Sequence, residues 1–441
     1  MPTMRRQRPK RLLRLGCGLA AIGLIAAGCG SGGSSSGTSG TLKIITWVNP
    51  PAVDAFKKID SEFQKKYPGI KVQLQTAVNV EGPYLTLQET SVDSSSADII
   101  TNVQPLQALP LNPTRANMTT WQFWTTHGVF APLNGQSFLN NYTGDALTSE
   151  TYNGKVYGIM AGSYQEGVFY NKAIFARYHL SPPTTWNQFL TVASTLKSHG
   201  VTPMYLGLGG VGPVYLQFLY YELMISDWYP HAAGGNLARD LENGTATWTS
   251  PWFTQAMNQE KQLTQYLEPN YTGVPWEGMP GALANGKAAM MPDGSWDMAL
   301  VHKANPSAQI GFFPLPGSNN PAENQPEVGD NLTISLLNKA PDKAAAMKWL
   351  QFFSQPDIYQ QYANMTGVSP VQSGTFTSPA AQALGSWLGK GVNLNVFYPP
   401  LSPNAAYWDQ RVNWPTLQLD VVQGSKTPAQ AEALYQSGWN K

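Results

Sequence analysis

The chain has 441 residues, which is too long for one ordinary hydrophobic core and indicates two or three structural units. Charged residues make up only 12% of it, whereas aromatic residues make up 11%. This composition is typical of a folded protein and excludes an intrinsically disordered one.

The first 28 residues have the pattern of a secretory signal. Six basic residues lie within residues 5–14, and an apolar stretch follows over residues 15–27, which is short for a membrane span. Small residues directly precede Cys29, as in the bacterial lipobox, where the cysteine is acylated and becomes the first mature residue. The sequence therefore predicts a lipoprotein signal peptide over residues 1–28 and a palmitate-type anchor on Cys29.

Removal of this segment leaves 22 basic and 27 acidic residues, a net charge of −5. An acidic mature chain without a basic cluster argues against nucleic-acid binding. Cys17 would be removed and Cys29 acylated, so no cysteine remains for a disulfide, a metal site or a nucleophile. Residues 30–40 are mostly Gly and Ser, so residues 29–40 form the lipidated cysteine and a tether of about 20 Å reach. We expect a lipid-anchored protein on the extracellular face of the cell membrane.

The folded part begins with a strand–helix–strand pattern. Residues 42–47 predict a strand, and Asn49 is expected to cap a helix that begins at Pro50 and ends before Pro68. Residues 70–75 alternate between apolar and polar side chains and predict a second strand. Such a unit implies a parallel pair of strands in an α/β fold.

Later segments continue the mixture of strands and helices. Residues 121–133 are expected to form an aromatic-rich loop. Strands are expected at 97–101, 155–160, 167–171, 310–313 and 332–336. Helices are expected after the cap Thr185, over 213–228, from 251, from Pro341 to Phe353 and from Pro356.

Residues 285–296 combine several structural signals in a short stretch. The apolar run 288–291 fits a buried strand, and residues 292–294 have the sequence of a turn or loop. Ser295 is a candidate N-cap for a helix beginning at Trp296. A large aromatic would then lie where a strand, a glycine turn and a helix N-terminus meet, the place where α/β folds bind ligands. The alternative is a buried Trp that closes a strand–helix corner.

Several stretches resemble, in order, the carbohydrate-binding extracellular solute-binding proteins of ABC importers, the family of maltose-binding protein. The resemblance covers roughly residues 41–437. Its motifs are GKVYGI at 154–159, FYNK at 169–172 followed by PPTTW at 182–186, GKAAM at 286–290 with GSW at 294–296, and AAAMKWL at 344–350 followed by GVSP at 367–370.

This resemblance implies a periplasmic-binding-protein-like fold, with two α/β lobes around a hinge and an inter-lobe cleft. Lobe 1 would comprise residues 41–161 and 312–368, and lobe 2 residues 166–308 and 372–441. The implied partners are a carbohydrate ligand, expected to be an oligosaccharide, and the membrane subunits of an ABC importer. The protein would be a monomer without cofactor, metal or catalytic residue.

A sugar site needs aromatic rings for the CH faces of the sugar and short polar side chains for its hydroxyls. By its match to the family motif, Trp296 is the leading ring candidate. Trp47 follows the first strand but could equally be a core residue, and Trp276 lies in a loop that could be simple surface. Trp408 and Trp414 correspond approximately to a late binding aromatic of the family.

The polar candidates for the sugar site follow the same resemblance. Asp293 could be a solvated turn acid, and Asp330 precedes an expected strand and could instead hold the crossover. Tyr164, and not Glu166, occupies the position where some relatives use a carboxylate, a departure from the maltose-binding pattern. The polar set is Tyr84, Asp98, Asn102, Tyr164, Asp293 and Asp330.

Two other functions remain open at this point. A secreted glycoside hydrolase would share the aromatic-rich cleft and need only two carboxylates. A binding protein of the same fold could take a non-sugar solute such as a polyamine or a phosphate ester. The expected cleft segments contain mostly Trp, Tyr, Asn and Gln, which favours a sugar.

Overall fold

The computed structural model describes residues 39–78, 82–102, 109, 113–115, 118–210, 213–231, 237–393 and 414–439. The predicted signal peptide, Cys29 and Trp408 lie outside the described residues, as does the tether except for its last two residues. No helix in the described part combines the length and apolar character needed to cross a membrane.

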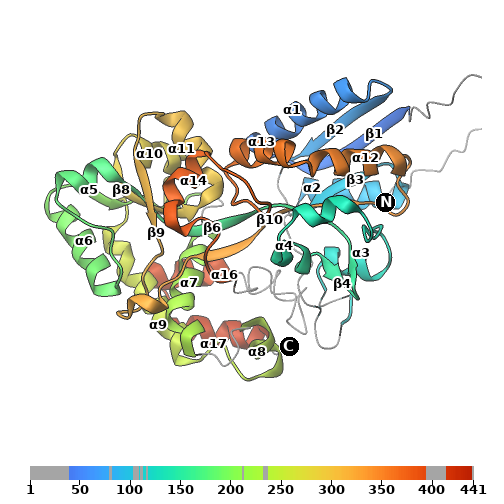
Figure 1. The fold of residues 1–441 in the computed structure, drawn as a ribbon. Helices are drawn as coiled ribbons and strands as arrows, with labels where there is room; N and C mark the ends of the chain where they lie inside the picture. The colour runs from blue at the N-terminus through green and yellow to red at the C-terminus, as the bar shows by residue number, and fades with distance from the viewer. Residues whose placement is uncertain are drawn as a thin grey trace, which may run out of the picture. The chain divides into compact units, whose positions relative to one another are not determined.

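The described strands form one mixed sheet and one small hairpin (Figure 1). The sheet order is β2-β1-β3-β10-β6-β8-β7, with β9 also paired to β6, and β4 pairs with β5. The strands are β1 (Gly40–Trp47), β2 (Ile70–Ala77), β3 (Ile99–Asn102), β4 (Thr151–Tyr152), β5 (Lys155–Val156), β6 (Ile159–Asn171), β7 (Thr202–Met204), β8 (Ala288–Gly294), β9 (Ile310–Phe313) and β10 (Glu327–Leu336).

The helices precede, follow or connect these strands. They are α1 (Pro50–Lys66), α2 (Pro83–Ser94), α3 (Thr120–Thr126), α4 (Gly144–Thr148), α5 (Lys172–Arg177), α6 (Trp186–Ser198), α7 (Val214–Asp227), α8 (Leu237–Asn243), α9 (Pro251–Leu263), α10 (Met279–Ala284), α11 (Met298–Ala304), α12 (Lys343–Phe353), α13 (Pro356–Thr366), α14 (Pro379–Leu384), α16 (Trp414–Val422) and α17 (Pro428–Trp439).

The predicted strand–helix–strand unit is confirmed. Asn49 accepts a hydrogen bond from the backbone N–H of Ala52 at 3.1 Å and so caps α1. Strands β1 and β2 pair in parallel along their whole length, and β3 pairs in parallel on the other side of β1. The carboxyl ends of these three strands therefore meet at one edge of the sheet.

The two strands expected at 155–160 and 167–171 are wrong as separate elements. Residues 155–156 belong to the hairpin with β4, whereas residues 159–171 form the single long strand β6. All residues of β6 except Ser163 and Tyr170 are buried. A strand buried on both faces lacks the alternation that reveals strand boundaries in a sequence, and this explains the error.

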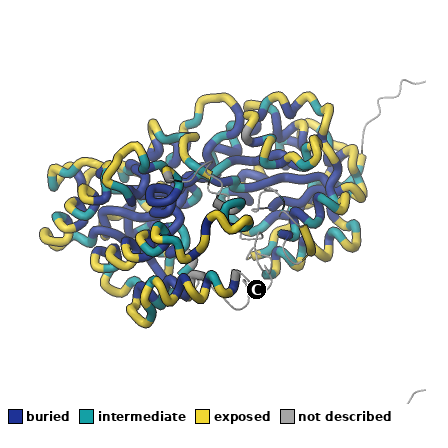
Figure 2. Tube along the Cα trace, turned by 90° about the horizontal axis from the view of Figure 1, so that it is seen from below, coloured by how far each residue is buried: buried dark blue, intermediate teal, exposed yellow. Residues whose placement is uncertain are grey.

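Two large clusters of buried apolar side chains lie on either side of the centre of the sheet. The first cluster is drawn from residues 42–161 and 332–371, and the second from residues 168–315 and 380–435. Figure 2 shows buried chain running through the interior of both regions, with exposed residues along the helices around them. The chain passes between the clusters along β6, along β10 and between residues 371 and 380.

The buried side chains of residues 312–315 lie in the second cluster, which differs from the lobe boundaries expected from the sequence. Phe312, Phe313 and Leu315 pack in the second cluster, although the prediction placed residues from 312 onward in lobe 1. The reason is that β9 pairs with residues 168–171 at the end of β6 that serves the second cluster. The exact lobe boundaries otherwise stay a prediction.

The turn expected at residues 292–294 is instead the end of strand β8. Residues 290–294 pair with residues 166–170 of β6 in antiparallel register. On its other side β8 pairs with β7 only as far as Met290, so Pro292 lies where that side has no strand neighbour. A strand tolerates proline in such a place because a missing N–H costs nothing on an open side.

The helix predicted to begin at Trp296 begins two residues later. Residues 295–297 form a 3-10 turn, and α11 starts at Met298. The Ser295 hydroxyl does not cap the helix but accepts a hydrogen bond from the backbone N–H of Gln165 at 3.2 Å. The expected loop at 121–133 is also partly wrong, because Thr119 and Gln122 form a capping box that opens α3.

Candidate ligand-binding site

Five aromatic side chains form a continuous row that begins in the second cluster and reaches β6. The Trp276 ring stacks on Tyr215, with centroids 5.7 Å apart, and Tyr215 meets Phe218 edge-on at 5.3 Å. Phe218 meets Trp296 at 5.6 Å, and Trp296 meets Tyr164 at 5.2 Å, both edge-on. We call these residues the aromatic row. It brings together Trp276, Trp296 and Tyr164, three residues that the sequence proposed separately.

Two glycines make room for the last two rings of the row. A side-chain Cβ at Gly294 would lie 2.2 Å from the Trp296 ring, so this ring folds back over the end of β8. A Cβ at Gly329 would lie 2.1 Å from the Tyr164 hydroxyl, and Gly329 is the β10 partner of Tyr164. Neither approach would be compatible with a larger residue in these strands.

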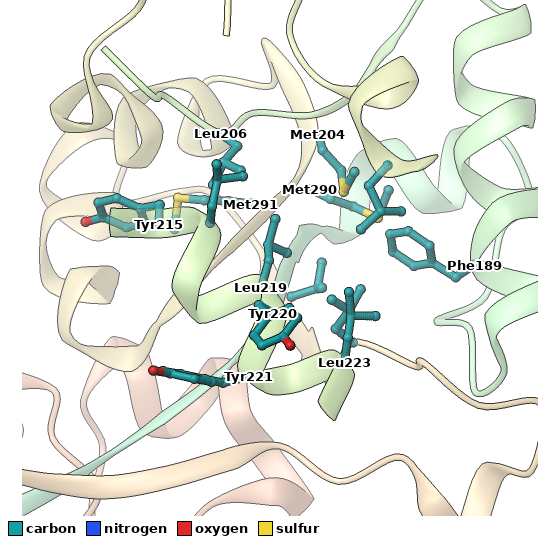
Figure 3. Close-up of a cluster of buried hydrophobic side chains, with 14 of the residues drawn as sticks. Phe189, Met204, Leu206, Tyr215, Leu219, Tyr220, Tyr221, Leu223, Met290 and Met291 are labelled. Atoms are coloured by element: carbon teal, nitrogen blue, oxygen red, sulfur yellow. The ribbon is translucent and has the colours of Figure 1, made fainter. Parts of the chain in front are cut away.

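The remaining rings of the row come from α7 and from a 3-10 turn. Residues 276–278 form that turn, which presents Trp276, whereas Tyr215 and Phe218 lie one turn apart on α7. Figure 3 shows α7 side chains packed among the methionines of β7 and β8, with the Tyr215 hydroxyl directed away from them. Tyr215 and Phe218 therefore attach the aromatic row to the core through α7.

Three members of the row keep exposed surface. Trp276, Phe218 and Trp296 are half-buried, whereas Tyr215 and Tyr164 are 6% and 8% exposed. The half-buried rings can offer an apolar surface to a ligand while the buried ones hold them in position. This combination fits the CH face of a sugar ring.

Two aspartates lie beside the row and interact with each other. Asp293 is 2% exposed and Asp297 is 5% exposed, and the charges of both raise the pKa of Tyr215 after the larger effect of its burial. Oδ1 of Asp293 accepts the N–H of Gly294 at 2.7 Å. Oδ2 of each aspartate is buried and receives no hydrogen bond from the described residues. Asp293 is therefore not the solvated turn acid that we considered as its alternative.

Burial changes the protonation of this aspartate pair. It raises the pKa of Asp293 well above its ordinary value, and the neighbouring Asp297 raises it further. Burial also raises the pKa of Asp297, to about 6, while its contact with Asp293 opposes the rise. The two carboxyl groups consequently share a proton near neutral pH.

Three glutamates form a second acidic group at the centre of the sheet. Glu166 on β6 is the direct strand partner of Glu327 on β10, and both are fully buried. Burial raises the pKa of Glu166 well above its ordinary value, and Glu327 and Glu222 raise it further. Burial also raises the pKa of Glu327, to about 8. Glu222 on α7 accepts the N–H of Leu315 at 3.1 Å.

Gln165 connects β6 to residues on both sides of the third passage of the chain between the clusters. Its Oε1 accepts the Ser369 hydroxyl at 2.7 Å and the Gly389 N–H at 3.0 Å, and its Nε2 donates to the carbonyls of Lys390 at 2.6 Å and Trp387. Four hydrogen bonds use all the capacity of this buried amide. Gln165 is thus a structural junction rather than a ligand group.

Two predicted site residues, Asp98 and Tyr84, instead use their polar atoms in hydrogen bonds within the fold. Asp98 lies before β3, at the edge of the sheet opposite the carboxyl ends, and its carboxylate accepts the N–H groups of Lys43 at 2.8 Å and Asp342 at 2.6 Å. Tyr84 is fully buried and its hydroxyl donates to the Thr101 carbonyl at 2.6 Å. Both side chains use their polar atoms to join elements of the first cluster.

The other first-cluster candidates lie at or near the expected edge. Trp47 ends β1, Asn102 ends β3, and these strands are parallel. Trp47 is half-buried against the first cluster, whereas Asn102 is 6% exposed. Asp330 does not precede a strand as expected but lies within β10, at a register shift that follows it. Trp414 begins α16.

Four residues of the aromatic row and its neighbouring acidic groups were not predicted from the sequence: Tyr215, Phe218, Glu222 and Asp297. The signal for Tyr215, Phe218 and Glu222 is an apolar helix that contains one glutamate and aromatics three residues apart. Such a helix is expected to be buried on all sides, so its acid must face a special environment.

A hollow of about 510 Å³ on α9 lies apart from these residues. It is lined by Thr249, Pro251, Thr254, Gln255, Asn258, Gln259 and Gln262. Its lining contains neither an aromatic ring nor any ligand residue predicted from the sequence.

Residues 49–360 match the model of the bacterial extracellular solute-binding protein family, which is well over half of the chain. The chain belongs to this family. It is 26% identical over 359 residues to the multiple sugar-binding protein of Streptococcus mutans, and the match covers 80% of this chain and 81% of that protein.

Solved structures of other solute-binding proteins share the fold of this family member. A raffinose complex of the binding protein RafE superposes with a TM-score of 0.70 at 18% identity, covering 91% of this chain and 100% of that one. A chitin oligosaccharide binding protein gives a TM-score of 0.72 at 19% identity, with 91% and 98% coverage. The fold is therefore the two-lobed α/β architecture that the sequence predicted.

Proposed function

We propose that this protein captures a carbohydrate between its lobes and delivers it to an ABC importer, while a lipid on Cys29 holds it at the extracellular face of the membrane. The observation that carries the proposal is the aromatic row, with its half-buried Trp276, Phe218 and Trp296. Relatives named for sugar binding support the ligand class.

In this proposal Trp296 and Trp276 contact the apolar faces of the sugar. Asp293 contributes a polar group from lobe 2, and Tyr164 contributes one from β6, where the chain crosses between the lobes. Trp47 and Asn102 would contribute from the carboxyl edge of lobe 1, and we expect an oligosaccharide to span both lobes. Trp408, Trp414 and Asp330 remain weaker candidates.

The hydrolase alternative has little support in the geometry. Its two carboxylates must reach the glycosidic bond from either side, with about 5–9 Å between them. Glu166 and Glu327, which are direct partners on β6 and β10, are 0% and 1% exposed and contact each other. The matched family binds solutes and supports a protein that is not an enzyme.

A thermal-shift screen over mono-, di- and oligosaccharides tests the ligand class, because a ligand that binds only the folded state raises the melting temperature. We expect at least one sugar to raise it in a concentration-dependent manner. A flat response to all sugars, together with the appearance of hydrolysis products, would favour the enzyme.

Anchoring is tested separately with a Cys29→Ala variant expressed in a bacterium that processes lipoproteins. We expect the unchanged protein in the membrane fraction and the variant in the medium or soluble fraction. Equal membrane retention of both would overturn the lipid anchor without affecting the sugar proposal.

A further inference from the structure

The site contains buried negative charge for which the described residues supply no positive partner. The carboxyls of Asp293 and Asp297 are at least nine-tenths buried, and among the described residues Oδ2 of each has no hydrogen-bond donor other than the proton that the pair shares. The ion pairs of the described residues, Lys57–Asp54, Arg239–Glu242 and Lys426–Asp420, all involve other acids. An acid pair without a cation is costly to ionise inside a protein.

The rings beside these acids also lack a positive neighbour. In the described part of the chain, no lysine or arginine lies over the rings of Trp276, Tyr215 or Trp296. The face of an aromatic ring attracts cations, most strongly for tryptophan. Rings and carboxyls therefore favour the same kind of ligand group, one that is positively charged and attached to an apolar surface.

From this arrangement we propose that the natural ligand is an amino sugar or an oligosaccharide containing one, whose protonated amine lies at the Asp293–Asp297 pair while its ring packs on Trp296. This inference rests on the proposed function and narrows it from carbohydrates in general to cationic carbohydrates. Binding would ionise the aspartate pair and release its shared proton, because a nearby cation favours the carboxylate form.

Other cations fit the site less well. Within the described residues no group of three or more His, Cys, Asp or Glu side chains is arranged to hold a metal ion. A linear polyamine would pair with acids but has no ring face to cover Trp296 and Trp276. An amino sugar uses both features, because its ring carries the apolar face and its amine the charge.

The test is a titration series in which one substituent changes. Glucose, glucosamine and N-acetylglucosamine, and their β-1,4-linked tetramers, carry a hydroxyl, an amine or an acetamide at the same carbon. Galactose, galactosamine and N-acetylgalactosamine carry the same three substituents on a second sugar. At about pH 6, where the aliphatic amine is protonated, we expect the amine to bind at least tenfold more tightly than the hydroxyl or acetamide form of its scaffold.

Proton release gives an independent readout. Calorimetry in two buffers of different ionisation enthalpy should show proton release on binding of the amine but not of its neutral parent. In the Asp297→Asn variant the preference for amine over hydroxyl should fall at least tenfold. Asp357→Asn makes the same charge change at an exposed position on α13 and should leave the preference unaltered.

The outcomes separate the two proposals. Neutral sugars that bind as tightly as their amines would overturn the cationic ligand and leave the sugar function intact. If no amino sugar binds while another sugar binds in the wider screen, the cationic ligand is likewise overturned and the sugar function stays intact. Spermidine that binds when no sugar does would overturn both.

Discussion

At the scale of single residues, the structure adds most to the description of Trp296. The sequence left it between a ligand contact and a buried corner. In the structure it is half-buried, folds over Gly294 and lies in the aromatic row between Phe218 and Tyr164. It is therefore held by its contacts within the protein while part of its surface stays exposed.

Trp296→Ala should weaken sugar binding by about 2 kcal/mol, roughly 30-fold, because a central buried aromatic contact is lost. Titration calorimetry with a sugar from the screen measures the change. Trp252→Ala removes another half-buried tryptophan of the second cluster, outside the row, and should leave affinity unchanged. Equal affinities for the Trp296 variant and the wild type would return Trp296 to the core.

Asp98 gives the opposite prediction, for stability rather than binding. Asp98→Ala leaves the backbone N–H groups of Lys43 and Asp342 without their acceptor and should lower the free energy of unfolding by about 2–4 kcal/mol. Urea denaturation measures this loss. The folded variant should bind sugar normally, since Asp98 lies at the edge opposite the carboxyl ends of β1 and β3, and weakened binding would restore it to the ligand site.

At the scale of elements, β6 and β10 connect the two clusters and carry the buried glutamate pair. A glutamate whose pKa is raised by folding stabilises the folded state below its ordinary pKa of 4.5, and this contribution is lost as the pH rises through the folded-state value. For Glu327 the folded pKa is about 8, so stability should fall between about pH 5 and pH 8.

Glu327→Gln should flatten this pH dependence, because the amide cannot ionise. Relative to the wild type, the free energy of unfolding of the variant should be on the order of 2–4 kcal/mol higher at about pH 8 than at about pH 5. Denaturant unfolding at several pH values measures the difference. The exposed Glu89 provides the control Glu89→Gln, which should follow the wild-type curve. A Glu327→Gln curve parallel to the wild type would mean that folding does not raise the pKa of Glu327.

The same elements show where a sequence pattern fails. The cap at Asn49 and the strand β1 were predicted from local signals and are confirmed. The sequence pattern predicts a turn at the end of β8 because it contains Pro292 and Gly294, yet pairing with β6 extends the strand through both. Turn propensity is a local preference, and hydrogen bonding to a neighbouring strand outweighs it.

At the scale of the molecule, we expect the ligand to close the two lobes by bending where β6, β10 and residues 371–380 pass between the clusters. Asp330, beside a register shift in β10, lies in one of these passages. Small-angle scattering with and without a saturating sugar should show a smaller radius of gyration in the bound form. No compaction at saturation would contradict closure as the signal to the importer.

The sequence alone indicated the family and the two-lobed class of fold. It also predicted an exported lipoprotein and most of the aromatic candidates. Family motifs, helix caps and export signals are local, so they can be recognised without coordinates. Only the tertiary structure showed which of the candidate side chains contact one another. It placed Asp98 and Tyr84 in hydrogen bonds within the fold and joined the other candidates Trp276, Trp296 and Tyr164 through α7. The physical reason is that ring contacts and buried charge depend on strand register and helix packing between residues far apart in the chain.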